Sequence, residues 1–263
     1  MNQKKLVNYL LSYEKSLVVP LISIYGRSGS GKSTIVQFVC KNLDLDFCYA
    51  DLRKSKTVFG CVNLILSELG HPNLKNAQGI NTAFSILEKF EKSNNSLFVL
   101  CLDEFDTLFY DKRGKPSDFI YKLLVLVEKL RKTSKHLCII TISNKILFEF
   151  DLDDRVVSRI GSSEIYFNSY SKDNILKIIR NRTKKSFSKP INDEILKYCA
   201  KISSEEHGDA RRAINLLRTS GEISGNDKKE ISKQHVDDAI KQLQKNQLTT
   251  VINDGSFHLH VLD

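Results

Sequence analysis

The segment from Gly26 to Thr34 is suited to holding phosphate groups. It reads Gly-Arg-Ser-Gly-Ser-Gly-Lys-Ser-Thr and fits the pattern G-x-x-x-x-G-K-[ST] without a mismatch, after an apolar run and before a helix-like segment. Glycines let such a loop wrap a phosphate with its backbone N–H groups, and a following helix N-terminus adds a favourable dipole. In this pattern Lys32 reaches the β- and γ-phosphates and Ser33 holds Mg²⁺. An ordinary Gly/Ser turn is the alternative, but the context favours an ATP–Mg²⁺ site formed by Gly26, Arg27, Ser28, Gly29, Ser30, Gly31, Lys32, Ser33 and Thr34.

Two carboxylates follow the apolar run Leu97–Leu102. They supply the acidic side chains for Mg²⁺ and for an attacking water that the phosphate loop itself lacks. In open α/β sheets, ligands bind at the carboxyl ends of the strands. We expect Asp103 to bind Mg²⁺ through water and Glu104 to orient and polarise an attacking water molecule. Many strands end in polar residues, so it is the pairing with the phosphate loop that makes this signal informative. Asp106 is expected to cap a helix.

One polar side chain at a strand end and two arginines are further candidates for contacts with the γ-phosphate. Asn144 follows the apolar run Leu137–Ile142 and can hydrogen-bond the attacking water, although it can also be an ordinary turn residue. Arg159 can act as a finger on a neighbouring molecule's phosphate or form a surface salt bridge with Asp151 or Asp153.

Arg211 lies in the first turn of a helix that Asp209 is expected to cap. A cation there opposes the helix dipole, a penalty that a nucleotide phosphate reverses. The alternative is that the Arg211 side chain is simply solvated.

The elements that must position these residues follow from hydrophobic periodicity. Short apolar runs alternate with helix-period segments, as in a parallel sheet covered by helices. The expected strands are Leu21–Tyr25, Phe47–Asp51, Leu97–Leu102 and Leu137–Ile142, and one of the expected helices carries Phe84, Leu87 and Phe90. After about Phe167 only helical patterns appear. We therefore predict an α/β nucleotide-binding domain over residues 1–167, a small helical domain over 168–247 and a tail over 248–263.

The net charge of +9 favours polyanionic partners through counterion release. Arg53, Lys54 and Lys56 lie at a loop–helix junction just before a helix-like Thr57–Leu69, where basic side chains can contact a phosphate backbone. A solvated charge run explains them equally well. No apolar run is long enough to cross a bilayer, and the six cysteines form no C-x-x-C pair. A cytoplasmic protein without membrane contact is expected.

Taken in order, these motifs resemble the Walker A, Walker B, first-sensor, arginine-finger and second-sensor motifs of AAA+ ATPases. The stretches Arg155–Gly161, Tyr166–Tyr170 and Glu206–Glu222 narrow the resemblance to initiators related to the eukaryotic origin-recognition and cell-division-control proteins, and Glu206–Glu222 is most similar to archaeal members. The resemblance covers roughly Leu21 to Leu243.

The resemblance has several implications. The sheet should have the AAA+ strand order, with a helical lid beyond about Asn168. Arg159 should act in trans on the ATP of an adjacent subunit, and Arg211 in cis. The segment with Arg53, Lys54 and Lys56 would correspond to an insertion that contacts double-stranded DNA. Family members mark replication origins, assemble with other initiator subunits and help load the replicative helicase. We therefore expect slow ATP hydrolysis that resets an ATP-controlled DNA-binding switch.

The sequence departs from the family pattern after Leu243. Members usually carry a C-terminal winged-helix domain, and Leu248–Asp263 is too short to form one. A fragment and a shortened paralogue are both compatible with this. Two other functions stay open: a regulatory ATPase that acts on a protein partner without gripping DNA, and a motor or clamp-loader-like ATPase with brisk turnover stimulated by DNA.

Overall fold

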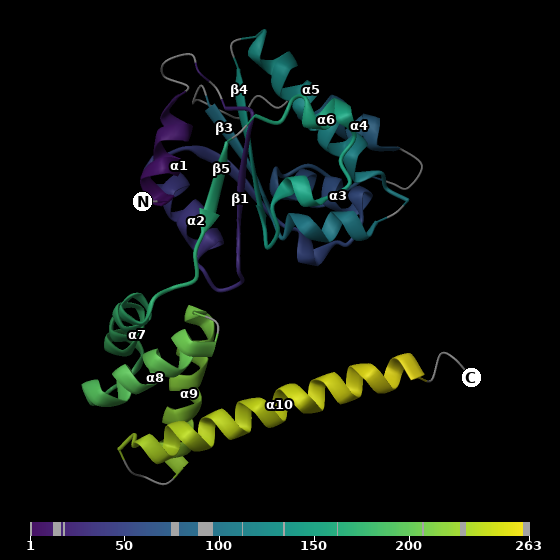
Figure 1. The fold of residues 1–263 in the computed structure, drawn as a ribbon. Helices are drawn as coiled ribbons and strands as arrows, with labels where there is room; N and C mark the ends of the chain where they lie inside the picture. Colours follow the sequence, from purple (N-terminus) through teal and green to yellow (C-terminus); the bar gives the residue numbers. More distant parts are fainter. Residues whose placement is uncertain are drawn as a thin grey trace. The chain divides into compact units, whose positions relative to one another are not determined.

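The computed structural model describes residues 2–12, 17, 19–74, 79–88, 97–111, 113–133, 135–161, 163–206, 208–226 and 230–259. The chain forms two compact units, Met1–Asn168 and Ser169–Asp263 (Figure 1). Among the helices of the described ranges, none combines the length and the apolar character that a bilayer span requires.

A parallel five-stranded sheet is the centre of the first unit. Its strands are ordered β2-β3-β4-β1-β5, and every neighbouring pair is parallel. The strands span Leu21–Gly26 (β1), Asp46–Asp51 (β2), Leu97–Asp103 (β3), His136–Ser143 (β4) and Glu164–Phe167 (β5). The expected parallel α/β sheet is confirmed, and each of the four expected strands is present with a shift of at most one residue at either end.

The fifth strand was not predicted. β5 has only four residues, and its burial alternates, with Ile165 and Phe167 inside and Tyr166 half exposed. Such a short run at a sheet edge carries too little apolar content to be recognised without its partner. Its position is fixed by pairing with β1, which places Phe167 opposite Gly26.

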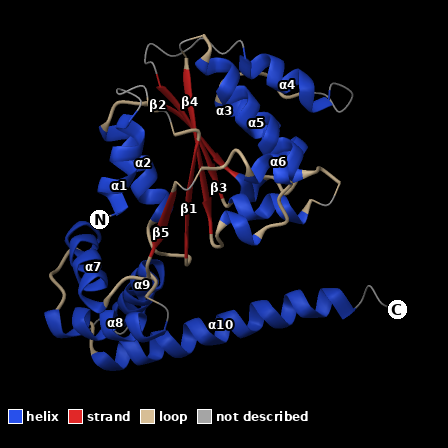
Figure 2. Ribbon diagram, turned by 45° about the horizontal axis from the view of Figure 1, so that its top comes forward, coloured by secondary structure: helices blue, strands red, loops and turns tan. Residues whose placement is uncertain are grey.

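Helices cover both faces of the sheet. α1 (Asn2–Leu11) and α2 (Lys32–Asn42) lie on one side, and α3 (Val58–Glu68), α4 (Gly79–Glu88) and α5 (Pro116–Arg131) lie on the other (Figures 1 and 2). Successive strand side chains point to opposite faces, so Ile22 and Ile24 join the α1–α2 core while Leu21 joins the α3–α5 core. The helix predicted around Phe84 is α4, but Phe90 lies outside the described residues.

Short helical turns follow three of the strands. They are η2 (Leu52–Lys54) after β2, η4 (Phe105–Tyr110) after β3 and η5 (Leu147–Glu149) after β4. The short helix α6 (Asp154–Val157) precedes β5. Asp106 was expected to cap a helix, and this was wrong, because Glu104 occupies the cap position of η4 and Asp106 lies inside its first turn.

Helices are the only regular secondary structure in the described residues of the second unit, as predicted. It consists of α7 (Lys172–Ser186), α8 (Asp193–Glu206), α9 (Ala210–Asn226) and α10 (Lys233–Leu259) around one apolar core. Ser171 caps α7 by accepting from the Asn174 N–H at 3.4 Å. α10 continues into the segment from residue 248 that we had expected to be a tail, and residues 260–263 lie outside the described ranges.

Gly26 should be required for the junction of β1 and β5. Its φ is 137°, and a Cβ atom there would lie 2.2 Å from the Phe167 carbonyl oxygen. Gly26→Ala therefore forces either the loop or β5 to shift, and we expect the free energy of unfolding in urea to fall by about 1–3 kcal/mol. Gly161→Ala is the matched control, because nothing lies within 4 Å of the added Cβ. Equal stability of the two variants would show that β5 can move away at no cost.

Candidate active site

The phosphate-loop segment connects β1 to α2 at the carboxyl edge of the sheet. Gly29 and Gly31 have φ values of 73° and 85°, in the left-handed region that favours glycine. Gly31 occupies the N-cap of α2 and has no side chain to cap it. The first N–H groups of α2 are therefore available to a ligand, and the helix dipole makes this position favourable for an anion.

Lys32 is the buried cation of the loop. Its side chain is 8% exposed, and its ammonium donates to the carbonyl oxygens of Gly26 at 2.6 Å and Arg27 at 2.9 Å. It also donates to Asn144 Oδ1 at 3.2 Å, which joins the end of β1 to the end of β4. The predicted lysine and the predicted polar residue, which are far apart in the sequence, thus meet at one edge of the sheet.

Asp103 is a buried carboxylate at the end of β3. It is 4% exposed and accepts from the Glu104 N–H at 2.9 Å and from the Tyr49 hydroxyl. The Ser33 side chain also interacts with this hydroxyl. Burial, followed by the Asp103 carboxylate, raises the pKa of Tyr49, so the hydroxyl keeps its proton. Oxygen ligands of this kind suit Mg²⁺, so Ser33 and Asp103, which both interact with Tyr49, fit a magnesium site.

Glu104 projects from a turn with φ 55° and ψ 43°, a conformation that few residues other than glycine adopt. Burial, then the neighbouring Asp103 charge, raises the pKa of Glu104, whereas the Arg53 guanidinium lowers it. The Arg53 Nη1 lies 3.9 Å from Glu104 Oε1. A carboxylate whose pKa is raised is a better general base than one that is fully solvated.

Arg53 was predicted only as a DNA contact, and the structure places it beside Asp51 and Glu104. Its guanidinium holds the Asp51 carboxylate with two hydrogen bonds of 3.0 and 2.9 Å. Those bonds lower the pKa of Asp51. Lys54 and Lys56 are exposed on the same segment. The three basic residues are thus adjacent in the chain, but Arg53 faces Asp51 and Glu104.

Arg159 lies at the opposite edge of the sheet from the phosphate loop. It lines a cavity of about 160 Å³ together with Pro20, which precedes β1, and His136, which begins β4. Its guanidinium pairs with Glu128 at 3.2 Å and lies 4.9 Å from the centre of the Tyr121 ring. The alternative partners Asp151 and Asp153 are not those observed for Arg159.

Asp209 caps α9 in the second unit, as predicted. Its carboxylate accepts from the Arg211 N–H at 2.7 Å, and Gly208 before it has φ 63°. The Arg211 side chain is exposed, and its role toward a phosphate stays a prediction. His207, in the same motif, lies outside the described residues.

Two residues that matter for the geometry were not singled out from the sequence. Tyr49 lies in β2 and meets Asp103 only because β2 and β3 pair, with Asp51 opposite Asp103. Tyr121 lies in α5 and carries both Arg155 and Arg159 over its ring. Both contacts join residues that are far apart in the chain, so sequence patterns do not reveal them. The one available signal was that Tyr49 lies shortly before Asp51, at the end of an expected strand.

Two family models match the chain. The model for the ATPase family associated with various cellular activities (AAA) matches residues 22–169. The model for the Cdc6 AAA+ ATPase-type lid domain matches residues 176–241.

Curated relatives and solved structures agree with these families. The chain is 32% identical to an ORC1-type DNA replication protein 1 of Sulfolobus acidocaldarius, over 97% of this chain and 65% of that protein. It is also 32% identical to an ORC1-type DNA replication protein of Desulfurococcus amylolyticus, over 84% of this chain and 57% of that protein. The structure of the Aeropyrum pernix ORC1 protein in complex with DNA superposes with a TM-score of 0.78 at 22% identity, covering 95% of this chain and 66% of that one. The chain therefore spans about three fifths of the length of these curated relatives.

Tyr49→Phe tests whether the hydroxyl that donates to Asp103 supports the magnesium site. Losing a hydrogen bond to a buried carboxylate should weaken ATP binding in Mg²⁺ by about tenfold. Binding of ATP in EDTA should stay within about twofold, because phosphate contacts with the loop are unaffected. Tyr110→Phe, at a tyrosine that is 82% exposed, is the control. An equal loss with and without Mg²⁺ would assign Tyr49 to general packing instead.

Proposed function

Because this chain belongs to the AAA family of ATPases, within the group of origin-recognition and cell-division-control initiators, we propose that it is an ATP-dependent DNA-binding switch for the initiation of DNA replication. The proposal of ATP binding and hydrolysis is supported by one observation. Four side chains come together at the carboxyl ends of the strands: Lys32, Asp103, Glu104 and Asn144. These groups match what ATP hydrolysis requires: a phosphate cradle, a metal ligand, a base and a polar group for water.

In the proposed reaction the loop N–H groups and Lys32 bind the phosphates. Mg²⁺ would be held by Ser33 and Asp103 and would neutralise phosphate charge. Glu104 orients and polarises the attacking water, and Asn144 fixes its position from the end of β4. The raised pKa of Glu104 makes this carboxylate a suitable proton acceptor, whereas Arg53 lowers that pKa and so favours the ionised form. Slow turnover would let the ATP-bound state persist.

Arg159 supports the proposal that subunits act together. It lies near Pro20 and His136, where β1 and β4 begin, whereas the phosphate loop follows the end of β1. A finger at that edge cannot serve the site of its own subunit, so it would complete the site of an adjacent copy or another initiator subunit. Arg211 would act in cis as the second sensor.

The DNA part of the proposal rests on charge and on the relatives. The chain has a net charge of +9, and Lys54 and Lys56 are exposed. A similar protein, Aeropyrum pernix ORC1, has been solved in complex with DNA. We propose that Lys54, Lys56 and, when released from Asp51, Arg53 contact the phosphate backbone of double-stranded DNA. Loading of a replicative helicase would be the downstream event.

Duplex DNA binding, followed by anisotropy with ATP, ADP or no nucleotide over a salt series, tests the switch. We expect binding that requires ATP and weakens steeply with salt, because cation–phosphate contacts release counterions. Lys54→Glu combined with Lys56→Glu should weaken binding and reduce the slope of log K against log salt by about 2. ATP binding should be unchanged.

A matched control separates local contacts from net charge. Lys201→Glu combined with Lys241→Glu makes the same charge change at exposed positions on α8 and α10. If both double variants lose affinity equally, the segment after β2 has no specific role. If the unaltered protein retains ATP but binds no DNA, the chain is better described as a regulatory ATPase that acts on a protein partner.

The contact between Arg53 and Glu104 generates a pH prediction. Turnover falls as pH drops through the pKa of the base, because only the ionised carboxylate polarises water. Arg53 lowers the pKa of Glu104, so Arg53→Ala should raise it and move the acid limb of the ATPase rate to higher pH. Lys54→Ala should leave the limb in place.

Glu104→Gln should retain ATP binding and suppress turnover; full hydrolysis in that variant would exclude Glu104 as the base.

A further inference from the structure

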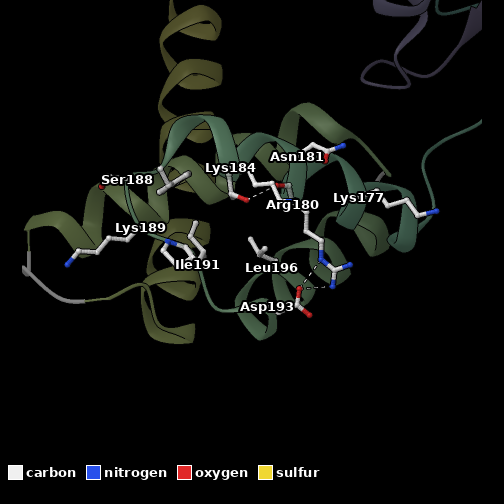
Figure 3. Close-up of a pocket in the computed structure, with 12 residues that line it drawn as sticks. Lys177, Arg180, Asn181, Lys184, Ser188, Lys189, Ile191, Asp193 and Leu196 are labelled. Atoms are coloured by element: carbon white, nitrogen blue, oxygen red, sulfur yellow. Dashed lines mark hydrogen bonds and ion pairs between the residues drawn. The ribbon is translucent and has the colours of Figure 1, made fainter.

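A second concave site lies wholly within the helical unit, away from every residue assigned above. It is a cavity of about 680 Å³ between α7 and α8, bordered by the connecting segment from Phe187 to Ile191 (Figure 3). This volume is within the range of sites that bind small ligands or a few side chains.

The charged part of the lining of this cavity is mainly cationic. It contains Lys177, Arg180, Lys184 and Lys189, whereas Asp193 is the one acidic residue among the described residues that line it. The Arg180 guanidinium is paired with Asp193, because its Nε and Nη2 donate to Asp193 Oδ1 at 2.9 and 2.6 Å (Figure 3). The three lysines therefore give the site its positive field.

Another part of the lining is apolar. Phe187, Ile191 and Leu196 are among the lining residues, and all three belong to or pack against the core of the helical unit. Phe187 is held in place from behind, because a Cβ atom on Gly221 of α9 would lie only 2.8 Å from its ring. The Asn181 and Ser188 side chains add neutral hydrogen-bonding groups to the lining.

From this combination we propose that the cavity binds an acidic segment of a partner protein that inserts an apolar side chain. The apolar floor would take the inserted side chain, and Lys177, Lys184 and Lys189 would pair with flanking carboxylates. Lys177 and Lys189 point away from each other on opposite sides of Arg180 (Figure 3), so carboxylates on both sides of an apolar residue can be reached.

The apolar floor favours a peptide over nucleic acid. A DNA backbone presents charge to a cationic surface and gains little from contact with Phe187 or Ile191. A peptide with an apolar anchor and an acidic rim matches the usual interface pattern of an apolar centre surrounded by polar contacts. The site is also independent of the phosphate loop, so its test does not depend on the ATPase proposal.

The test measures binding of a short fluorescein-labelled peptide of aspartate and glutamate with two central leucines, at about 0.15 M salt so that diffuse attraction is screened. A second peptide has serine in place of the leucines. We expect the full chain to bind the leucine peptide at least about tenfold more tightly than the serine peptide, because burying two leucines is favourable. Lys177→Glu combined with Lys189→Glu should weaken leucine-peptide binding by about tenfold.

Lys201→Glu combined with Lys241→Glu is the control, since neither lysine lines the cavity and the net charge changes equally. It should change peptide affinity by less than about twofold, and an unchanged circular dichroism spectrum of both variants should show that the chain remains folded. Equal affinity for the two peptides, or equal losses in the two variants, would overturn the proposal. Duplex DNA is tested in parallel. If the Lys177/Lys189 variant loses DNA binding but still binds the leucine peptide, the proposal is also overturned.

Discussion

The parallel register of β1, β3 and β4 is the constraint on which the candidate active site depends. Tyr25 lies opposite Ser143, and Asp103 lies opposite Ile142, so the three strands end at nearly the same level. The residues that follow each end are then neighbours in space, although they are far apart in the chain. A shift of one residue in any pair would rotate a strand's side chains to the other face and disperse the site. The apolar residues on both faces of these strands are thus what holds the polar groups together.

The buried charges at this edge impose a second requirement, because each must be compensated locally. Lys32 is compensated by two carbonyl oxygens and Asn144, and Asp103 by a backbone N–H and the Tyr49 hydroxyl. The charge of Glu104 is compensated less completely. It is partly buried beside Asp103, and its nearest cation, Arg53, stays 3.9 Å away and is bound more closely to Asp51. Burial with incomplete compensation leaves Glu104 with a raised pKa, which suits the proton acceptor that we propose it to be.

Most of the site could be predicted from the sequence, because its signals are local. A glycine-rich loop between a strand and a helix, or two acids after an apolar run, is complete within a short stretch of chain. What could not be predicted depends on contacts between distant segments. Tyr49 gains its role from β2 pairing with β3, Arg53 turns toward Asp51 and Glu104, and β5 is recognisable as a strand only beside β1. Asp106 failed as a cap because the chain turns left-handed at Glu104, two residues before the predicted cap.

The position of Arg159 links this geometry to assembly. In a parallel sheet the loop that binds phosphate follows the strand ends, whereas a residue just before β5 is held where strands begin. Arg159 is therefore separated from its own phosphate loop by the length of β1. Its present partners, Glu128 and the Tyr121 ring, are both on α5 and partly exposed, so the guanidinium can exchange them for a phosphate without leaving a buried charge unpaired. In the proposed arrangement, one subunit holds the binding groups of one site and the finger of another. Full neutralisation of the γ-phosphate would then require two subunits, and ATP turnover would depend on assembly.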